Sequence, residues 1–126
     1  MNNKIYKVLR AKEWEFALNT GTIVTNLDDQ DGFIHLSTAA QLARTLSLFF
    51  KDSSQVFLLQ LDPEKIDYSE LLYEKPYHDR KKRRSAFPHL YAKLRTDQIA
   101  NVWALERGAF VLPEDVLMQI ENSHIY

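Results

Sequence analysis

Residues 33–37 read FIHLS and residues 87–91 read FPHLY, so one short chain carries the pattern Phe, any residue, His, Leu and a hydroxyl-bearing residue twice. Because side chains alternate along a strand, the aromatic, imidazole and hydroxyl groups of each stretch would share one face. These residues are Phe33, His35 and Ser37 in the first stretch and Phe87, His89 and Tyr91 in the second. The repeat raises the hypothesis that two such faces form two walls of one site.

The segments before FIHLS predict a strand, a helix and a polar loop. Residues 4–9, KIYKVL, are typical of a strand. Residues 11–21 predict a short amphipathic helix, because apolar residues recur at helical spacing and Gly21 is a natural stop. Residues 22–32 predict a brief β-branched piece and then an acidic polar loop that leads into FIHLS.

The segments between the two stretches predict a helix and a buried strand. Thr38 begins TAAQ, a capping-box pattern in which glutamine follows threonine by three residues, so a helix is expected from Thr38 to about Phe50. Residues 55–62, QVFLLQLD, form a nearly unbroken apolar run. Such a run indicates a strand buried on both faces, at the centre of a sheet.

The remaining chain adds strands and a final helix. Residues 68–74 and 98–106 are predicted as strands, and residues 112–122 as a helix. FPHLY and the residues after it are also strand-like, but Pro88 cannot donate a ladder hydrogen bond, which predicts an edge strand or a bulge. Strands and helices are mixed without regular alternation, so we expect the α+β class.

Composition excludes several classes of protein. The 126 residues, 45% of them hydrophobic, suit a single domain over residues 1–126. Sixteen basic and seventeen acidic side chains leave a formal charge of -1, so no global field attracts nucleic acid or a membrane. The chain has no cysteine, and it has no apolar run long enough for a signal peptide or a membrane span. We therefore expect a cytoplasmic protein whose partner is a small ligand, with its oligomeric state open.

The first stretch ends at a predicted helix start, which suits an anion. His35 and Ser37 would project together there, and free N–H groups near Thr38 would add donors. An imidazole can also act as an acid or a base near neutral pH. The alternative is that His35 is a half-buried histidine bonded to backbone and that Ser37 only precedes the cap.

The second stretch offers aromatic rings around an imidazole. Phe87 and Tyr91, with Phe33 from the first stretch, could stack on a flat ligand beside His89, although packing in a core is the more common use of such rings. Glu74 ends the preceding predicted strand and could hold one of the histidines or a ribose hydroxyl. A solvated loop carboxylate is the alternative for Glu74.

Other kinds of site find little support. The basic run from Lys81 to Arg84 could contact phosphate, but four charges without interleaved aromatics are more often a solvated loop. His35, His89 and Glu74 could form a set of two histidines and a carboxylate, yet no close ligand pair supports a metal. GxGxxG, phosphate-loop and GxSxG motifs are absent from the sequence.

The motifs IYKV, DGFIHLST, VFLLQLD and FPHLY together resemble the DUF952 family of small uncharacterised proteins, over residues 5–111. In that family the second motif usually continues Gly-Pro-Leu, whereas this chain continues Ala92-Lys93-Leu94. The family in turn is similar to a remote branch of the ADP-ribosyltransferase fold, nearest to the RNA 2'-phosphotransferases, which consume NAD. This resemblance implies small split antiparallel sheets with flanking helices around a nicotinamide-nucleotide cleft, with NAD as the candidate cofactor.

The same resemblance carries residue roles and one departure. It implies that His35 and Ser37 lie on the second signature strand, and that Glu74 stands for the third-motif glutamate. The first strand of such transferases commonly ends His-Gly-Thr, but here Lys7 and Val8 fall at the histidine and glycine positions. A valine would crowd the nicotinamide, and a lysine cannot accept a hydrogen bond.

The expectation from the sequence is a domain that binds a nucleotide or another phosphorylated metabolite. His35, His89 and Glu74 are the candidate catalytic residues for glycosyl or phosphoryl transfer. The candidate ligand-binding residues are Phe33, Ser37, Thr38, Phe87 and Tyr91. The alternative is a non-catalytic binding module that kept the fold and lost the NAD-dependent reaction, so the sequence leaves open whether the chain is an enzyme. A third hypothesis is that both histidines only stabilise the fold and bind no ligand.

Overall fold

The computed structural model describes residues 4–75, 85–106 and 112–123. Its α-helices are α1 (Ala11–Thr20), α2 (Asn26–Asp31), α3 (Leu42–Phe49) and α4 (Glu114–Ser123). Short 3₁₀ turns are η1 (Ala39–Gln41), η2 (Pro63–Lys65), η3 (Tyr68–Glu70) and η4 (Thr96–Gln98). The strands are β1 (Ile5–Arg10), β2 (Thr22–Ile23), β3 (Ile34–His35), β4 (Ser37–Thr38), β5 (Gln55–Leu61), β6 (Leu71–Glu74), β7 (Phe87–Leu90), β8 (Leu94–Arg95) and β9 (Ile99–Glu106).

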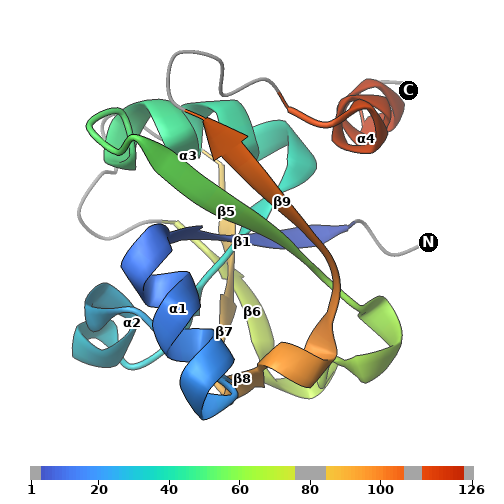
Figure 1. Ribbon diagram of the computed structural model, residues 1–126. Helices are drawn as coiled ribbons and strands as arrows, with labels where there is room; N and C mark the ends of the chain where they lie inside the picture. The colour runs from blue at the N-terminus through green and yellow to red at the C-terminus, as the bar shows by residue number, and fades with distance from the viewer. Residues whose placement is uncertain (1–3, 76–84, 107–111, 124–126) are drawn as a thin grey trace.

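The strands form small antiparallel sheets. One sheet has the order β4-β1-β5-β9, a second has the order β3-β7-β6, and β2 pairs with β8. In Figure 1, α1 and α2 lie together beside one part of the sheets, while α3 and α4 lie at the opposite end of the molecule. The fold is therefore α+β, as the mixed order of elements predicts.

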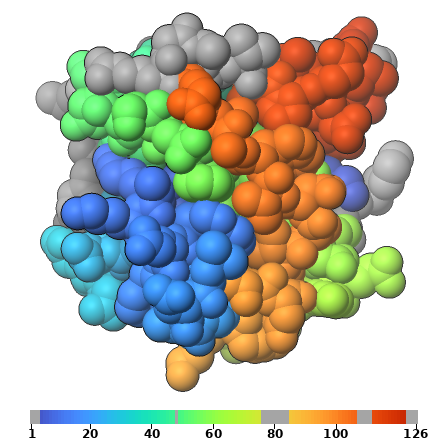
Figure 2. All heavy atoms as spheres, in the orientation of Figure 1, coloured from blue at the N-terminus to red at the C-terminus, as the bar shows by residue number. Residues whose placement is uncertain are grey.

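The interior consists of two clusters that share the larger sheet. Because side chains alternate along β5, Leu59 and Leu61 pack into one cluster, whereas Val56 and Leu58 pack into the other. The first cluster joins the sheet to α1 and to the β3-β7-β6 sheet, and the second joins it to α3 and α4. β5 lies between β1 and β9 and is buried over most of its length, as its unbroken apolar run predicts. Figure 2 shows β9, the edge strand beside it, at the molecular surface.

FIHLS does not form one strand. Ile34 and His35 pair with β7, whereas Ser37 and Thr38 pair with β1 in the other sheet. Leu36, between them, is buried in the first cluster. The first stretch therefore links the two sheets, and that link places its polar side chains at the junction between them.

FPHLY lies at the centre of its sheet with no register shift, which corrects the prediction of an edge strand or a bulge from Pro88. β7 is the central strand of its sheet, with β3 on one side and β6 on the other. The carbonyl of Pro88 accepts a hydrogen bond of 3.1 Å from the N–H of Leu36, so its backbone faces the side of β3. β3 has already ended at His35, and the missing N–H of Pro88 therefore breaks no ladder pair.

The acidic segment before FIHLS is a helix, which corrects the predicted loop. Thr25 Oγ1 accepts a hydrogen bond from the N–H of Asp28 at 3.1 Å, and Asp28 Oδ2 accepts one from the N–H of Thr25 at 2.9 Å. This reciprocal capping box begins α2. Gly32 follows the helix with φ of 81°, in the left-handed region that favours glycine.

Among the residues that the structure describes, no helix has the length and apolar character needed to cross a membrane.

Candidate functional site

The two histidines of the repeated pattern stand opposite one another. His35 and His89 are partners in the register of β3 with β7, and their ring centroids are 5.3 Å apart in an edge-on arrangement. Phe33 packs against both imidazoles, at 4.4 Å from His35 and 4.1 Å from His89, and it also contacts Tyr91 at 5.2 Å. The strand pairing thus brings the two imidazoles together, with the Phe33 ring against both.

His89 is hydrogen-bonded to a carboxylate, and a phenol donates to the same carboxylate. Its Nδ1 lies 2.8 Å from Glu74 Oε1, and the Tyr91 hydroxyl donates to the same oxygen at 2.7 Å. The Tyr91 and His89 hydrogen bonds lower the pKa of Glu74 below its usual value, so Glu74 is a carboxylate at neutral pH. The hydrogen bond to Glu74 in turn raises the pKa of Tyr91. Together these contacts fix the orientation of a buried imidazole.

His35 has a different carboxylate. Its Nε2 lies 2.8 Å from Asp31 Oδ2, on the last turn of α2. Burial lowers the pKa of His35 below its usual value, and the positive charge of Lys7 adds to that effect. The carboxylates of Asp28 and Asp31 oppose it. His35 is therefore neutral at pH 7, with a carboxylate close enough to stabilise a transient positive charge.

A buried ion pair between Lys7 and Asp28 contacts the backbone of β3, the strand that carries His35. Lys7 Nζ lies 2.9 Å and 2.7 Å from the two carboxylate oxygens of Asp28, and it donates to the carbonyl of His35 at 3.0 Å. Asp28 Oδ1 also accepts from the N–H of His35 at 2.9 Å. Burial lowers the pKa of Lys7, while Asp28 opposes that shift. The pair ties β1, α2 and β3 together through both backbone groups of His35.

A cavity of about 520 Å³ lies beside β1. β4 pairs only with Ile5 and Tyr6, whereas β5 pairs with β1 as far as Arg10. From Lys7 onward, β1 therefore has no second strand partner among the described residues. The cavity is lined from this stretch of β1, from α2 and α3, and from the strands that carry the histidines. Its volume falls within the usual range for small-ligand pockets, about 300–1,000 Å³.

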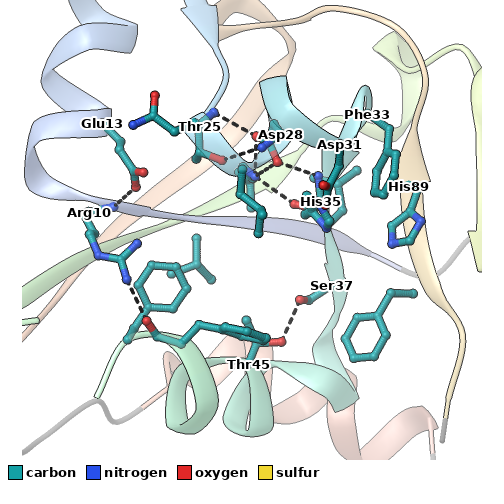
Figure 3. A pocket seen from close by; sticks show the side chains of 18 residues that line it. Arg10, Glu13, Thr25, Asp28, Asp31, Phe33, His35, Ser37, Thr45 and His89 are labelled. Atoms are coloured by element: carbon teal, nitrogen blue, oxygen red, sulfur yellow. Dashed lines mark hydrogen bonds and ion pairs between the residues drawn. The ribbon is translucent and has the colours of Figure 1, made fainter. Parts of the chain in front are cut away.

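The two ends of the cavity differ in chemistry. In Figure 3, Phe33 and His89 lie at one end, and Arg10 and Glu13 lie at the other. Ser37 and Thr45 lie along the wall between them, with their hydroxyl oxygens 3.0 Å apart. The arrangement can orient an elongated ligand with one part against the imidazoles.

The cavity separates the residues predicted from the sequence into two groups. The lining residues among them are Phe33, His35, Ser37, Phe87 and His89. The others, Glu74, Tyr91 and Thr38, do not line it. Glu74 and Tyr91 act on His89 from outside, and the N–H of Thr38 donates to Gln41 Oε1 at 3.0 Å to cap η1. The basic run from Lys81 to Arg84 lies outside the described residues.

Four functional candidates were missed by the sequence reading: Lys7, Arg10, Asp28 and Asp31. The capping-box signal at Thr25 to Asp28 could have indicated α2, and a four-residue spacing relates Asp31 to His35. No local signal pairs Lys7 with a carboxylate 21 positions away. Within residues 4–75, 85–106 and 112–123, no group of three or more potential ligands could hold a metal ion.

A family model described as "Protein of unknown function (DUF952)" matches residues 8–102. The chain belongs to this family. It is similar to Protein CC0527 from Caulobacter crescentus, whose crystal structure gives a TM-score of 0.74 at 28% identity over 92% of this chain and 97% of that one. A double mutant of the same protein gives the same values. The solution NMR structure gives a TM-score of 0.68 at 29% identity, covering 89% of this chain and 88% of that one. No curated protein matches the DUF952 chain.

Proposed function

We propose that the cavity binds a nucleotide or another small phosphorylated metabolite, and that His35 and His89 transfer protons in a group-transfer reaction on it. One observation carries the proposal. Two imidazoles, each hydrogen-bonded to its own carboxylate, face one another on paired strands at the wall of a ligand-sized cavity. Structural histidines need one hydrogen-bonding partner each, but they do not need a shared cavity.

The carboxylates assign the tautomers of the two rings. A carboxylate only accepts hydrogen bonds, so His89 carries a proton on Nδ1, which faces Glu74, and its neutral form has a lone pair at Nε2. By the same argument His35 carries its proton on Nε2, which faces Asp31, and its lone pair is at Nδ1. Each ring therefore has one defined nitrogen with which to accept a proton.

The closeness of the rings favours one shared charge. Two imidazolium ions with centroids 5.3 Å apart would repel each other, and His89 contributes to the lowered pKa of His35. A pair that carries a single extra proton has one acid and one base at the same time. Such a pair can take a proton from an attacking hydroxyl and give one to a departing oxygen, as phosphoryl transfer requires. In glycosyl transfer from NAD the nicotinamide departs as a neutral ring, so only the base is needed.

The resemblance stated from the sequence supports an NAD-dependent form of the proposal. On the resemblance to ADP-ribosyltransferases, the junction between the small sheets is the nicotinamide-nucleotide cleft, with His35 and Ser37 on its second strand. The cavity lies at that junction, and Phe33 and Phe87 could contact a flat ring there. NAD is therefore the first cofactor to test.

A second candidate function is binding without catalysis. Lys7 takes the position where the transferases have a ribose-binding histidine, and its ammonium is engaged by Asp28 and by the carbonyl of His35. It is buried and committed to these partners, which leaves no equivalent of the histidine contact. This observation favours a module that kept the fold and lost the NAD-dependent reaction.

An NMR titration of the histidine rings distinguishes these functions. The probes are NAD, ADP-ribose, nicotinamide and an oligonucleotide with a 2'-phosphate. Joint, saturable shifts of His35 and His89 with one probe are expected, and turnover of that probe would then separate the enzyme from the binding module. If no probe moves either ring, the nucleotide proposal is wrong.

Variants then test the positioning of His89. Tyr91→Phe removes the hydroxyl that helps to keep Glu74 ionised, so the low-pH limb of the pH–rate profile should move upward while the substrate still binds. Tyr73→Phe is the matched control, because Tyr73 lies on the neighbouring strand with half of its surface exposed. Identical profiles for the two variants would exclude a positioning role for Tyr91.

A further inference from the structure

Arg10 ends β1 at the end of the cavity that is remote from the imidazoles (Figure 3). Its side chain is anchored twice. One terminal nitrogen donates to the carbonyl of Phe49 at 2.7 Å, and the guanidinium carbon lies 4.5 Å from the centroid of the Phe50 ring. A cation–π contact and a backbone hydrogen bond both favour this orientation of the exposed guanidinium.

Among the described residues, no carboxylate forms an ion pair with the Arg10 guanidinium. Among the described ranges, the ion pairs involve other cations, and the exposed Arg95 has Asp97 at 3.3 Å. Glu13 lines the same end, but its Oε1 accepts from the backbone N–H of Arg10 at 2.7 Å and caps α1. In Figure 3 the Glu13 carboxylate lies at the Arg10 backbone, away from the guanidinium.

We propose that Arg10 binds a terminal phosphate, or a similar compact oxyanion, of an elongated ligand whose reacting end lies at His35 and His89. A guanidinium presents five N–H donors, and the carbonyl of Phe49 uses one of them. The others suit the paired oxygens of a phosphate. This inference rests on the proposed function for the reacting end alone, because the anion site itself needs only Arg10 and its anchors.

The position of Arg10 narrows the class of ligand. A ligand that spans the cavity has an oxyanion at one end, an apolar or flat middle part, and the bond to be changed at the other end. Phe87 and Val8 also line the cavity and offer apolar surface to such a ligand. A phosphate placed at Arg10 would serve as a handle for binding, and it would not be the group that is transferred.

The first experiment observes Arg10 directly. The Nε–Hε signals of the ¹⁵N-labelled chain are followed during titration with inorganic phosphate, with the Arg10 signal identified by its loss in Arg10→Lys. We expect a saturable shift for Arg10 and only a small, linear drift for Arg95. A response of Arg10 no larger than that of Arg95 would overturn the proposal.

The second experiment compares a nucleotide with its nucleoside. Adenosine 5'-monophosphate should bind more tightly than adenosine, and Arg10→Gln should remove that advantage, a loss of roughly ten- to hundredfold in affinity for a hydrogen-bonded charge pair. Arg10→Lys should keep part of it, and Arg95→Gln should keep all of it. Arg10→Lys also guards against a folding defect in Arg10→Gln, since it retains the charge and the alkyl stem.

The outcomes separate this inference from the proposed function. A phosphate response at Arg10, with no movement of either imidazole for any nucleotide, would support the anion site and refute the nucleotide reaction. Imidazole shifts that are the same in wild type and in Arg10→Gln would support the reaction site and refute the role of Arg10.

Discussion

Asp28 accepts hydrogen bonds from the ammonium of Lys7, from the N–H of His35 and from the N–H of Thr25. Its side chain is fully buried, so each of these donors compensates for the loss of water around a charge. The position of His35 therefore depends on a carboxylate that does not touch its ring. A change at Asp28 or Lys7 would act on the site through the backbone of β3.

Lys7→Met tests this dependence. The substitution leaves the Asp28 charge buried without its main partner, so the free energy of unfolding should fall by about 3–5 kcal/mol. Urea denaturation measures the loss, and Lys12→Met, on the exposed face of α1, should change stability by less than about 0.5 kcal/mol.

The double variant Lys7→Met/Asp28→Asn completes the cycle. Removing both charges should be less damaging than the sum of the two single changes, because neither charge is then left alone. Strict additivity of the two substitutions would show that the ion pair contributes no coupling.

The pKa of His35 should respond to Asp31 in a defined direction. The Asp31 hydrogen bond raises this pKa against the larger effect of burial, so Asp31→Asn should lower it further below 6.5. The control is Asp29→Asn, an exposed neighbour on the same helix. Ring titration by NMR measures both, and an upward shift in Asp31→Asn would contradict the assigned partnership.

The lowered pKa of His35 also fixes the direction in which pH changes the stability of the fold. A histidine whose pKa is lowered by folding binds its proton first in the unfolded chain. Its contribution to stability is therefore complete above pH 6.5 and is lost as the pH falls from 6.5 through the lower folded value. Asp31→Asn should extend this loss to lower pH.

At the residue scale, the sequence predicted neighbours wherever the alternation of side chains along a strand was enough to place them. The two-residue period of a strand predicted that Phe33, His35 and His89 would share one region, because neighbouring strands carry the same pattern. It could not place Lys7 against Asp28, since that contact depends on how β1 and α2 meet in space. It also gave Glu74 as a candidate that could hold one of the histidines, and Glu74 is hydrogen-bonded to His89 from outside the cavity.

At the scale of elements, α2 carries Asp28 and Asp31, the two carboxylates that are hydrogen-bonded to His35. It is only six residues long, so its capping box and its left-handed Gly32 stop matter more than helical propensity. Sequence patterns found the long elements, such as β5 and α1, because their apolar periods extend over many residues. The same patterns predicted a loop at α2, since five of its six residues are acidic or amide, and they predicted an edge strand or a bulge at β7 because of Pro88.

Gly32→Ala tests the role of the α2 stop. Forcing a Cβ into the left-handed conformation should cost about 1 kcal/mol of stability, although no atom lies within 4 Å of the added carbon. Gly21→Ala, at φ of 79° after α1, has the same local strain and equal space. Both variants should lose similar stability in denaturant, but only Gly32→Ala should shift the His35 ring signals. Equal shifts in the two variants would argue against a link from α2 to the site.

At the scale of the whole molecule, the cavity arises from unequal strand lengths. β4 covers two residues of β1, while β5 covers five, and the chain crosses from one sheet to the other within FIHLS. No single-sequence pattern encodes such a mismatch, because it depends on which strands become neighbours. The resemblance to the ADP-ribosyltransferase fold supplied an expectation of split sheets, which the periodicity alone did not provide.

The shared sheet should also make the two core clusters unfold together. Leu58 and Leu59 are adjacent on β5 and fully buried, but each packs into a different cluster. Leu58→Ala and Leu59→Ala should each lower the free energy of unfolding by about 2–5 kcal/mol, and each should shift one common calorimetric transition. Leu72→Ala, at a side chain that is 51% exposed on β6, should leave that transition nearly unchanged. A transition that stays at the wild-type temperature in Leu58→Ala would mean that the cluster under the histidines folds independently of α3 and α4.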